Sequence, residues 1–456
     1  MKRQSSSALA LLMVAVAATA FARAQGFQIP DDVKASVRAR VDNGYSVGIV
    51  VAVVDGTGAR YFSYGSTTKA GGQPVNERTV YEIGSITKVF TAVTLAEMAI
   101  KGEVALDDPV QRYLPDSVHV PSRPGHEITL RLLSAQRSGL PRMPGNFAPA
   151  DMSNPYVGYD PAHLYAFLNG YTLPRDPGAS YEYSNLGVNL LGLALTRRNG
   201  TAYDEMVLKR VAGPLGMTDT RVTLTPDLRA RFAHGYAGEQ EAANWDFDPY
   251  LGGAGSLRST AADMATFLAA AIGLRHTPLD SAFRLTEAIE FDAGPTMRIG
   301  LGWHVIGPDS AEGIWHNGGT GGYRTFIGFD PQRKIGVVVL SNSTLSIDDI
   351  AFHILNPASP LVTVRAAIAV PADSLDAYVG TYQLTPQIAI GIRKDGTGLV
   401  AEATGQGEAP IYASARDEFF LKVMDAQLSF VRDSTGRVVS LVLHQGGRDT
   451  RAPKAP

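Results

Sequence analysis

The sequence contains no cysteine among its 456 residues. This absence excludes disulfide bonds, thiolate metal sites and a thiol nucleophile, so any nucleophile must be another kind of side chain. Charged residues are also few, at 19% of the chain, and the net charge is only −3. A chain with so little excess positive charge is not suited to hold nucleic acid electrostatically, and we expect no nucleic-acid partner.

The apolar run Ala8–Phe21 is too short to span a bilayer comfortably. It follows Lys2 and Arg3 and ends at Ala22-Arg23-Ala24. A basic start, an apolar middle and an Ala-x-Ala end are typical of a secretory signal peptide, predicted here over residues 1–24. We expect cleavage after Ala24 and an exported protein, periplasmic or secreted, with no membrane association afterwards. Because the segment holds three basic residues and no acidic ones, its removal changes the net charge from −3 to −6.

Strand patterns lie near both ends of the next 330 or so residues, and helical patterns lie between them. The early strand runs surround a turn sequence, Asp55-Gly56-Thr57-Gly58, which indicates a hairpin. This order predicts an α+β domain over residues 28–355, whose sheet is closed by distant parts of the chain. The strand runs are Val47–Val54, Tyr61–Gly65, Gly313–His316, Tyr323–Phe329 and Ile335–Asn342, and the helical patterns include Leu186–Arg197 and Ala261–Ala271.

The last part of the chain has a different pattern. Residues 356–371 show little periodicity and are predicted to be a linker. Short strand-like runs separated by Gly and Asp then predict a small all-β barrel or sandwich over residues 372–450. These runs are Tyr378–Leu384, Ile388–Arg393, Leu399–Ala403, Glu418–Val423, Leu428–Arg432 and Val438–His444.

Ser85 and Lys88 form the most informative motif, Ser-x-x-Lys, at the start of a predicted helix. Gly102 is a plausible end of that helix. A serine hydroxyl is a weak nucleophile, but an amine kept neutral by desolvation or by another cation can accept its proton. The motif alone is common, and a capping serine followed by a solvated lysine explains most occurrences. The helical period is carried by Val89, Val93, Ala96 and Ile100.

Tyr183 and Asn185 form a second motif, Tyr-x-Asn. A phenol can shuttle protons if cations hold it as phenolate, and an amide two residues later can bind a substrate carbonyl and the active lysine. The alternative is a buried tyrosine beside an asparagine that caps the following helix.

His316, Gly318 and Gly319 form a third motif at a strand edge, within His316-Asn317-Gly318-Gly319. A cationic or hydrogen-bonding side chain there can support the phenol and orient a substrate carboxylate. Gly318 permits close approach of a substrate backbone, and the N–H of Gly319 can form an oxyanion hole with that of Ser85. A lone histidine on a strand is more often structural, but the following glycines make this one less ordinary.

These three motifs, in this order, resemble those of the serine β-lactamase and penicillin-binding-protein superfamily. The closer resemblance is to the class C β-lactamase branch, which includes D-Ala-D-Ala carboxypeptidases, D-aminopeptidases and esterases, and it covers roughly residues 35–350. It implies a β-lactamase/transpeptidase-like fold, with an antiparallel sheet flanked by helices and a helical subdomain. Supporting segments are Leu106-Asp107-Asp108-Pro109, Leu114-Pro115, Ser138-Gly139-Leu140-Pro141, Leu215-Gly216-Met217, Gly252-Gly253-Ala254-Gly255 and Gly300-Leu301-Gly302-Trp303.

The resemblance also implies roles. Ser85 matches the acylated nucleophile, Lys88 its proton-handling partner and Tyr183 the proton shuttle to the leaving group. Asn185, His316, Gly318 and Gly319 match substrate-binding positions. No cofactor or metal is implied, and the nine histidines form no His-x-x-x-His pair.

Two departures from the family pattern stand out. His316 occupies the place where class C β-lactamases usually carry lysine, which argues against efficient β-lactam turnover. Within 128–141, Leu132, Ser134, Ala135, Gln136 and Arg137 replace the usual residues, and we expect altered packing near the site. The region 375–448, opening Leu375-Asp376-Ala377-Tyr378, resembles the lipocalin-like domain often fused to such hydrolases.

The sequence therefore predicts an exported serine hydrolase that acts on a small-molecule or peptide substrate. Three interpretations stay open. One is a peptidase or amidase acting on D-amino-acid peptides such as cell-wall stems, and another is an esterase or weak β-lactamase. The third is a penicillin-binding or sensor protein that is acylated but hardly turns over. The natural substrate, the oligomeric state and the role of the C-terminal domain are left open.

Overall fold

The computed structural model describes residues 26–288, 290–307 and 313–455. The predicted signal peptide, residues 1–24, lies outside them. Contacts divide the chain into an N-terminal unit, whose main part is residues 46–360, and a C-terminal unit, whose main part is residues 361–456. Among the described residues, no helix is long and apolar enough to cross a membrane.

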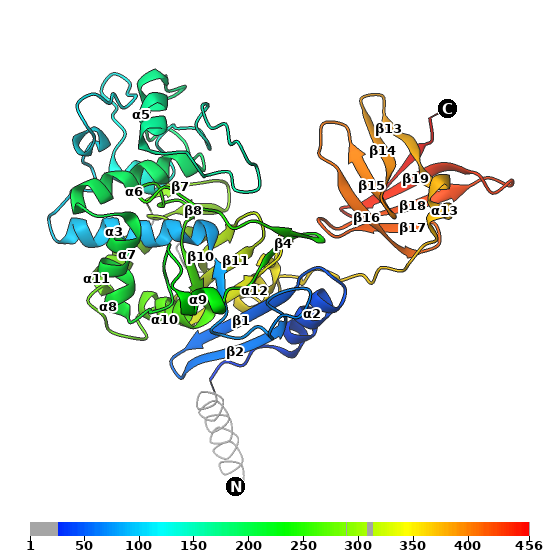
Figure 1. The fold of residues 1–456 in the computed structure, drawn as a ribbon, viewed down its shortest axis with the longest axis horizontal. Coiled ribbons are helices and arrows are strands. Elements are labelled where there is room, and N and C mark those ends of the chain that lie inside the picture. Colours follow the sequence, from blue (N-terminus) through cyan, green and yellow to red (C-terminus); the bar gives the residue numbers. More distant parts are fainter. Residues whose placement is uncertain (1–25, 289, 308–312, 456) are drawn as a thin grey trace, which may run out of the picture. The chain divides into compact units, whose positions relative to one another are not determined.

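The N-terminal unit is built on an eight-stranded antiparallel sheet (Figure 1). The expected hairpin is β1 and β2, and β1 also pairs with β12 in the register Val51–Val339. The earliest and latest strands of the unit are therefore neighbours, as the sequence predicted. The order across the sheet is β2 (Gly58–Gly65), β1 (Gly48–Asp55), β12 (Ile335–Ser341), β11 (Arg324–Asp330), β10 (Gly313–Gly319), β9 (His304–Ile306), β8 (Met297–Ile299) and β7 (Phe291–Asp292).

Helices cover both faces of the central strands, which explains why β12 is wholly apolar and buried. On one face, Leu268 of α10 (Ala261–Ala271) lies against Gly336. On the other face, Phe352 of α12 (Asp348–Leu355) contacts Phe326, which is the cross-strand partner of Val339. Gly336 and Val339 point to opposite sides because side chains alternate along a strand.

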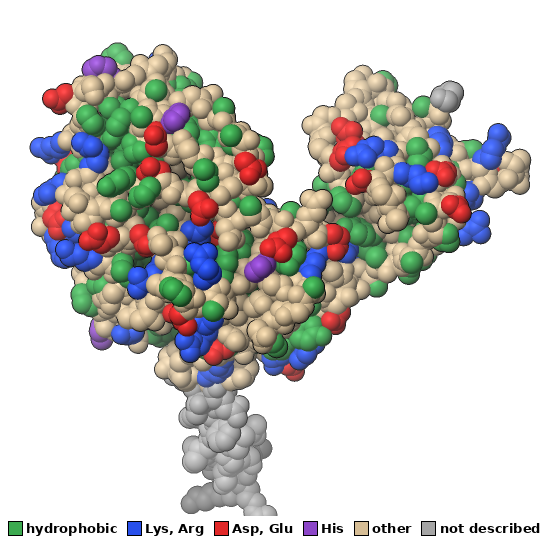
Figure 2. Space-filling view, viewed as in Figure 1, with side chains coloured by type: hydrophobic (Ala, Val, Ile, Leu, Met, Phe, Trp, Pro, Cys, Tyr) green, Lys and Arg blue, Asp and Glu red, His purple; other side chains and the backbone are tan. Residues whose placement is uncertain are grey.

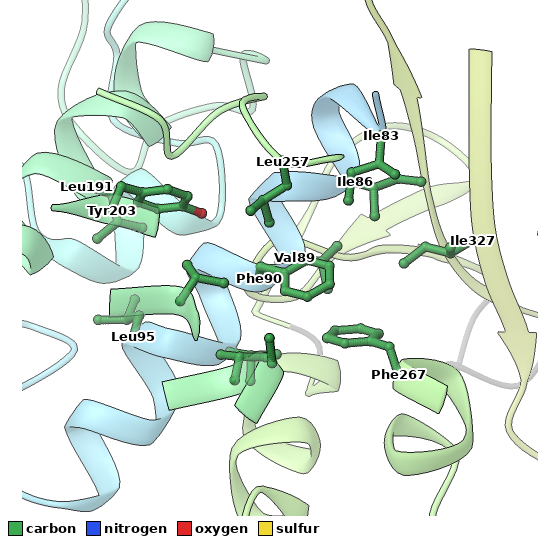
Figure 3. Packing of buried hydrophobic residues seen from close by; sticks show 14 of the residues in the cluster. Ile83, Ile86, Val89, Phe90, Leu95, Leu191, Tyr203, Leu257, Phe267 and Ile327 are labelled. Carbon is green, nitrogen blue, oxygen red and sulfur yellow. The ribbon is translucent and has the colours of Figure 1, made fainter. Parts of the chain in front are cut away.

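Helix α3 (Thr87–Ile100) is the central helix of the unit, since 12 of its 14 residues are buried. Figure 3 shows Val89 and Phe90 pointing into a cluster with Leu257, Phe267 and Ile327. A short 3₁₀ turn, η1 (Gly84–Ile86), precedes α3. Ser85 therefore lies in this turn and not in the first turn of the α-helix as predicted.

The remaining helices form the helical part of the unit around α3 and α6. Two small sheets complete it, β3 (Val80–Glu82) with β6 (Arg258–Thr260) and β4 (Gly235–Ala237) with β5 (Gln240–Ala242). The helices are α2 (Asp31–Asp42), η2 (Val110–Tyr113), α4 (Leu130–Ser134), α5 (Pro161–Gly170), α6 (Asn185–Asn199), α7 (Tyr203–Val207), η3 (Leu208–Ala212), α8 (Gly213–Leu215), α9 (Pro226–Ala230) and α11 (Asp280–Glu287).

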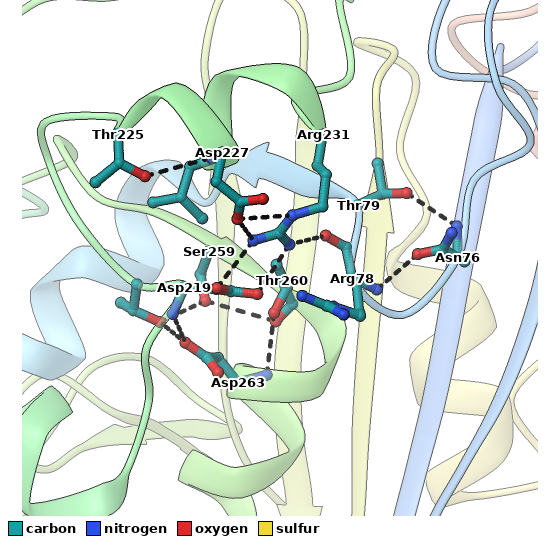
Figure 4. Close-up of polar contacts among 12 residues, drawn as sticks. Asn76, Arg78, Thr79, Asp219, Thr225, Asp227, Arg231, Ser259, Thr260 and Asp263 are labelled. Carbon is teal, nitrogen blue, oxygen red and sulfur yellow. Dashed lines mark hydrogen bonds and ion pairs between the residues drawn. The ribbon is translucent and has the colours of Figure 1, made fainter.

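A polar network joins the loops around α9 to the start of α10 (Figure 4). Arg231 forms ion pairs with Asp219 and Asp227. Asp263 accepts hydrogen bonds from the backbone N–H of Asp219 at 2.9 Å and from the hydroxyl of Thr220 at 2.8 Å. The network therefore fixes these loops with buried or partly buried polar groups.

The C-terminal unit is an eight-stranded antiparallel meander, nearly closed into a barrel by a bridge between Tyr382 and Lys454. Its interior holds aromatic side chains, including Tyr378, Tyr382, Phe419 and Phe430. The short helices α13 (Ala372–Leu375) and η4 (Asp376–Tyr378) precede the first strand. The strands are β13 (Gly380–Thr385), β14 (Ile388–Asp395), β15 (Gly398–Ala403), β16 (Ala409–Ala415), β17 (Glu418–Leu421), β18 (Ala426–Arg432), β19 (Val438–Gln445) and β20 (Arg448–Pro453).

Surface charges of both signs are mixed. On the face drawn in Figure 2, Lys and Arg side chains are interspersed with Asp and Glu over each unit. On that face, the charges therefore do not separate into one acidic and one basic region.

Candidate active site

Ser85 lies in η1, and η1 packs against strand β10. It is only partly buried, whereas Gly84 before it and Ile86 after it are buried. Gly84 has φ +51°, and a Cβ at this position would lie 2.7 Å from the backbone N of Gly319. Only glycine meets both conditions, so Gly84 allows the peptide of Ser85 and the end of β10 to lie side by side. Gly84 directly precedes the Ser-x-x-Lys motif, and its role was not predicted from the sequence.

The side-chain nitrogen of Lys88, Nζ, lies at the centre of the site. Lys88 Nζ lies 3.0 Å from Ser85 Oγ, 2.9 Å from Asn185 Oδ1 and 2.7 Å from the carbonyl oxygen of Ala254. The lysine side chain is almost completely buried. Burial, with a smaller effect of Arg142, lowers the pKa of Lys88 well below its usual value of 10.5.

The partners of Lys88 match those of a neutral amine. A neutral amine has two N–H donors and one lone pair. The Ala254 carbonyl and Asn185 Oδ1 can only accept, so they take the two N–H groups. The lone pair then faces the Ser85 hydroxyl, which can donate its proton to it. This arrangement prepares Ser85 for deprotonation.

Tyr183 lies beside Lys88 and Arg142. Lys88 Nζ is 4.8 Å, and the Arg142 guanidinium carbon 5.0 Å, from the centre of the Tyr183 ring. Burial raises the pKa of Tyr183 above 10, and the contacts with Ser85 and Arg142 oppose this rise only in part. Tyr183 is therefore a protonated phenol in the free site, and not the phenolate considered from the sequence. As a phenol it can donate a proton directly to a leaving group.

Asn185 is brought to Lys88 by the first turn of α6. The cap of this helix is Ser184 and not Asn185, because Ser184 Oγ accepts a 2.8 Å hydrogen bond from the N–H of Gly187. The asparagine side chain is thus free to bind Lys88. Gln136 lies in the segment that departs from the family pattern and contacts the Tyr-x-Asn motif. Its Oε1 accepts a 2.7 Å hydrogen bond from the backbone N–H of Ser184.

His316 is buried on β10 and neutral. Its Nδ1 lies 2.6 Å from the carbonyl oxygen of Asn317, which requires a hydrogen on Nδ1. The His304 ring lies 4.8 Å from the His316 ring, centre to centre. Burial, then His304 and Lys88, lower the pKa of His316 well below 6.5. It therefore cannot supply a positive charge to a substrate carboxylate, although its ring lies 6.3 Å from that of Tyr183.

Gly318 and Gly319 differ in what they contact. A Cβ on Gly318 would lie 2.0 Å from the carbonyl oxygen of Ile83, so this glycine lets β10 pack against the segment before Ser85. The expected role of Gly318 in admitting a substrate backbone stays a prediction. Gly319 lies beside Gly84, where its N–H and that of Ser85 can converge on one oxygen atom.

Aromatic side chains surround the same region. Tyr156 stacks on Phe247, with ring centres 4.4 Å apart, and lies 5.3 Å from Trp245. A Cβ on Gly255 would contact both Phe247 and Gly84, so this aromatic group lies close to the nucleophile. Sequence reasoning did not identify it. Arg142 was also not predicted as a site residue, although it directly follows the segment Ser138–Pro141 that supports the family resemblance.

Two family models match the chain. The model described as Beta-lactamase matches residues 33–356, and a Domain of unknown function (DUF3471) matches residues 364–452.

Relatives with similar sequences include two bacterial proteins. The D-alanyl-D-alanine-carboxypeptidase/endopeptidase AmpH of Escherichia coli (strain K12) is 29% identical over 317 residues, which cover 66% of this chain and 81% of AmpH. Penicillin-binding protein 4* of Bacillus subtilis (strain 168) is 26% identical over 437 residues, covering 89% of this chain and 94% of that protein.

Solved structures with a similar fold include two from other bacteria. A class C beta lactamase from Rhodobacter sphaeroides gives a TM-score of 0.63 at 24% identity, over 72% of this chain and 99% of its own. The D-alanine carboxypeptidase AmpC from Burkholderia cenocepacia gives a TM-score of 0.60 at 25% identity, again over 72% and 99%. The described sheet and helices therefore form a class C β-lactamase-like fold.

Proposed function

This chain belongs to the Beta-lactamase family, and we propose that it is a serine hydrolase that cleaves an amide or ester bond through an acyl-enzyme at Ser85. The single observation that carries the proposal is the set of partners around Lys88 Nζ. Two oxygens that only accept hydrogen bonds take its N–H groups, and the Ser85 hydroxyl lies 3.0 Å from it. A solvated lysine or a capping serine would not need this arrangement.

The proposed first step is acylation. The Ser85 proton passes to Lys88 Nζ while Ser85 Oγ bonds to the substrate carbonyl carbon. The N–H groups of Ser85 and Gly319 donate to the resulting oxyanion. Tyr183 donates its phenolic proton to the leaving group as the scissile bond breaks, and it recovers a proton from Lys88.

The proposed second step is hydrolysis of the acyl-enzyme. A water molecule attacks the ester carbonyl, and its proton is relayed to Lys88 through Tyr183, which accepts it as it passes its own phenolic proton to the amine. The same N–H groups stabilise the second oxyanion. Ser85 Oγ then leaves as its proton returns, and the free site is restored.

The substrate class that we favour is a peptide ending in D-amino acids, such as a cell-wall stem. The support comes from the activities for which the relatives are named, among them AmpH as a D-alanyl-D-alanine carboxypeptidase and endopeptidase. Small neutral esters are the second candidate, because His316 is uncharged and places no cation on β10. Slow deacylation would instead make the protein an acylatable sensor.

The test uses the chain from Gln25 with a D-Ala-D-Ala peptide, a penicillin and a short-chain p-nitrophenyl ester. Product formation and the intact mass of the protein are followed together, with Ser85→Ala as control. Turnover of one substrate that is absent from the control supports the proposal and identifies the reaction class. A persistent adduct without product favours the sensor. Full activity of Ser85→Ala would refute the mechanism.

We also propose export with cleavage after Ala24, and domain limits at 28–355 and 372–450 joined by 356–371. The basic, apolar and Ala-x-Ala regions support export. The division of contacts at Pro360 and Leu361 supports the domain limits. N-terminal sequencing of the protein from a periplasmic extract should begin at Gln25, whereas a chain that retains Met1 would contradict cleavage.

A further inference from the structure

Arg142 is a cation at the active site without an acidic partner among the described residues. Its side chain is exposed, and it forms no ion pair or side-chain hydrogen bond with any of them. Its guanidinium carbon lies 5.0 Å from the centre of the Tyr183 ring. Other arginines of the N-terminal unit do have acidic partners, such as Arg131 with Asp107 and Glu290.

The backbone of Arg142 is fixed to the site. Its carbonyl oxygen accepts the N–H of Asn185 at 3.0 Å and that of Leu186 at 3.3 Å, the first two amides of α6. The preceding carbonyl, that of Pro141, accepts the Ser184 hydroxyl at 2.7 Å. The guanidinium therefore projects from a fixed backbone position next to the Tyr-x-Asn motif. This favours ligand affinity, because little backbone entropy has to be lost on binding.

The other groups near Ser85 that could attract an anion are neutral or less accessible. His316 carries no charge, for the reasons given above. Asn317 donates to the Asp348 carboxylate at 2.6 Å. Arg324 is a second cation near the site, because a Cβ on Gly319 would contact its guanidinium, which donates to the carbonyl of Tyr323 and is acted on by the charge of Asp348. Arg324 is half-buried and Arg142 is exposed, so of these two described arginines Arg142 is the more accessible to an anion.

We propose that Arg142 binds a carboxylate on the leaving group of the substrate. This inference rests on the proposed function, because Tyr183 is the residue that protonates the leaving group and Arg142 lies on its ring. Arginine presents two parallel N–H donors that match the two oxygens of a carboxylate. The preferred substrates are therefore acyl donors whose leaving group carries an anion, as the terminal residue of a peptide does. The specificity determinant therefore lies in the loop between α4 and α5 and not on β10.

The experiment compares two esters of phenylacetylglycine. One has 3-hydroxybenzoate as its leaving group and the other 3-hydroxybenzamide, so that the two differ in charge and hardly in size. We measure kcat/KM for both esters with the wild-type chain, Arg142→Gln, Arg142→Lys and Arg229→Gln. Arg229 is exposed on α9 and serves as the matched control for the loss of one positive charge.

We expect the wild-type protein to prefer the anionic ester by about 10-fold or more, the scale of a charge-assisted hydrogen bond. In Arg142→Gln this ratio should fall toward 1, mainly through KM, and Arg142→Lys should recover part of it. Arg229→Gln should keep the wild-type ratio. The backbone carbonyl that holds α6 is present in every variant, and thermal unfolding checks that each is folded.

Two results would overturn the inference. In the first, Arg142→Gln keeps the wild-type ratio, which means that another group binds the anion. In the second, both esters lose activity equally, which means that Arg142 acts on Tyr183 or on the fold. Intact mass separates these from a failure of the proposed function. If neither ester acylates Ser85 in the wild-type protein, the hydrolase proposal fails and this inference with it.

Discussion

The two units of the chain differ in how many polar side chains they bury. The N-terminal unit buries Lys88, His316, Glu82 and Asp263 among apolar residues. In the described part of residues 361–456, by contrast, Ser440 is the one buried polar side chain, and ion pairs such as Arg393 with Glu408 are at the surface. Burying an ionisable group is unfavourable, so it is found where it serves a purpose. The contrast locates the candidate catalytic groups in the N-terminal unit, whereas the interior of the barrel is packed with apolar and aromatic side chains.

Replacing the buried lysine is expected to have the largest effect. Lys88→Met removes the proton acceptor of Ser85 but keeps most of the side-chain volume in the core. We expect kcat/KM for a p-nitrophenyl ester to fall by about 10³-fold or more, at the upper part of the range for loss of general-base catalysis. The control is Lys101→Met at the other end of α3, where the lysine is exposed. A loss of less than 10-fold in Lys88→Met, with the control unchanged, would show that another base activates Ser85.

The barrel core offers a second test of the contrast. Phe430 packs against Tyr378, Phe419 and Tyr382, with ring centres 4.8, 5.4 and 5.5 Å away. Phe430→Ala should destabilise the C-terminal unit by about 3–4 kcal/mol, because it leaves a cavity in an aromatic core. Val439→Ala, at a partly exposed position of β19, should cost far less.

The tryptophans allow the two units to be followed separately. Trp245, Trp303 and Trp315 all belong to the N-terminal unit. We expect Phe430→Ala to shift the urea transition measured by far-UV circular dichroism while the tryptophan fluorescence transition keeps its midpoint. If both transitions shift together, the two units unfold as one cooperative system. The contrast between them would then concern their structures and not their stabilities.

Asp263 should make stability depend on pH in a way that no barrel residue does. Burial raises the pKa of Asp263 to about 6, above the unfolded value of 3.8. The folded state therefore binds the proton more tightly, and this contribution to stability is lost as pH rises from about 4 through about 6. Relative to Asp263→Asn, the wild-type protein should gain about 1 kcal/mol on going from pH 7 to pH 5.

The measurement is the free energy of urea unfolding of both proteins, followed by tryptophan fluorescence at the two pH values. Taking the difference between the proteins cancels the titration of all other groups. Asp116→Asn, at an exposed position, is the control and should show no such difference. A pH-independent difference for Asp263→Asn would mean that its hydrogen bonds to Asp219 and Thr220 offset the cost of burial in full.

The sequence predicted the fold best where one signal was sufficient. Strand β12 is buried on both faces and reads as a continuous apolar run, and α10 has the predicted limits Ala261–Ala271. Strands β16 and β20 were not predicted. Pro410 interrupts β16, and five of the six residues of β20 are exposed, so neither has an alternating apolar pattern.

The candidate site was predictable only where a short motif carries it. Ser85, Lys88, Tyr183 and Asn185 do lie together, although they are up to 100 positions apart in the chain. The protonation states could not be read from the sequence, because they depend on burial that only the fold creates. The contribution of Arg142 was equally invisible, since nothing in the local sequence indicates that an arginine lacks an acidic partner.

The smallest expected effect concerns His316 and tests the neutrality of the site. Because the pKa of His316 is held well below 6.5, we expect no change in its charge around pH 6.5 or above. The kcat/KM of the wild-type chain for a neutral ester should therefore rise with pH only through the ionisation of Lys88, whose neutral form is the base. His316→Asn should give a profile of the same shape, even if its height differs. An inflection near pH 6.5 in the wild-type profile that is lost in His316→Asn would mean that the histidine titrates in the working enzyme. His316 would then be able to carry the positive charge that we assign to Arg142. His316→Asn and Arg142→Gln together therefore decide which residue binds the carboxylate of the leaving group.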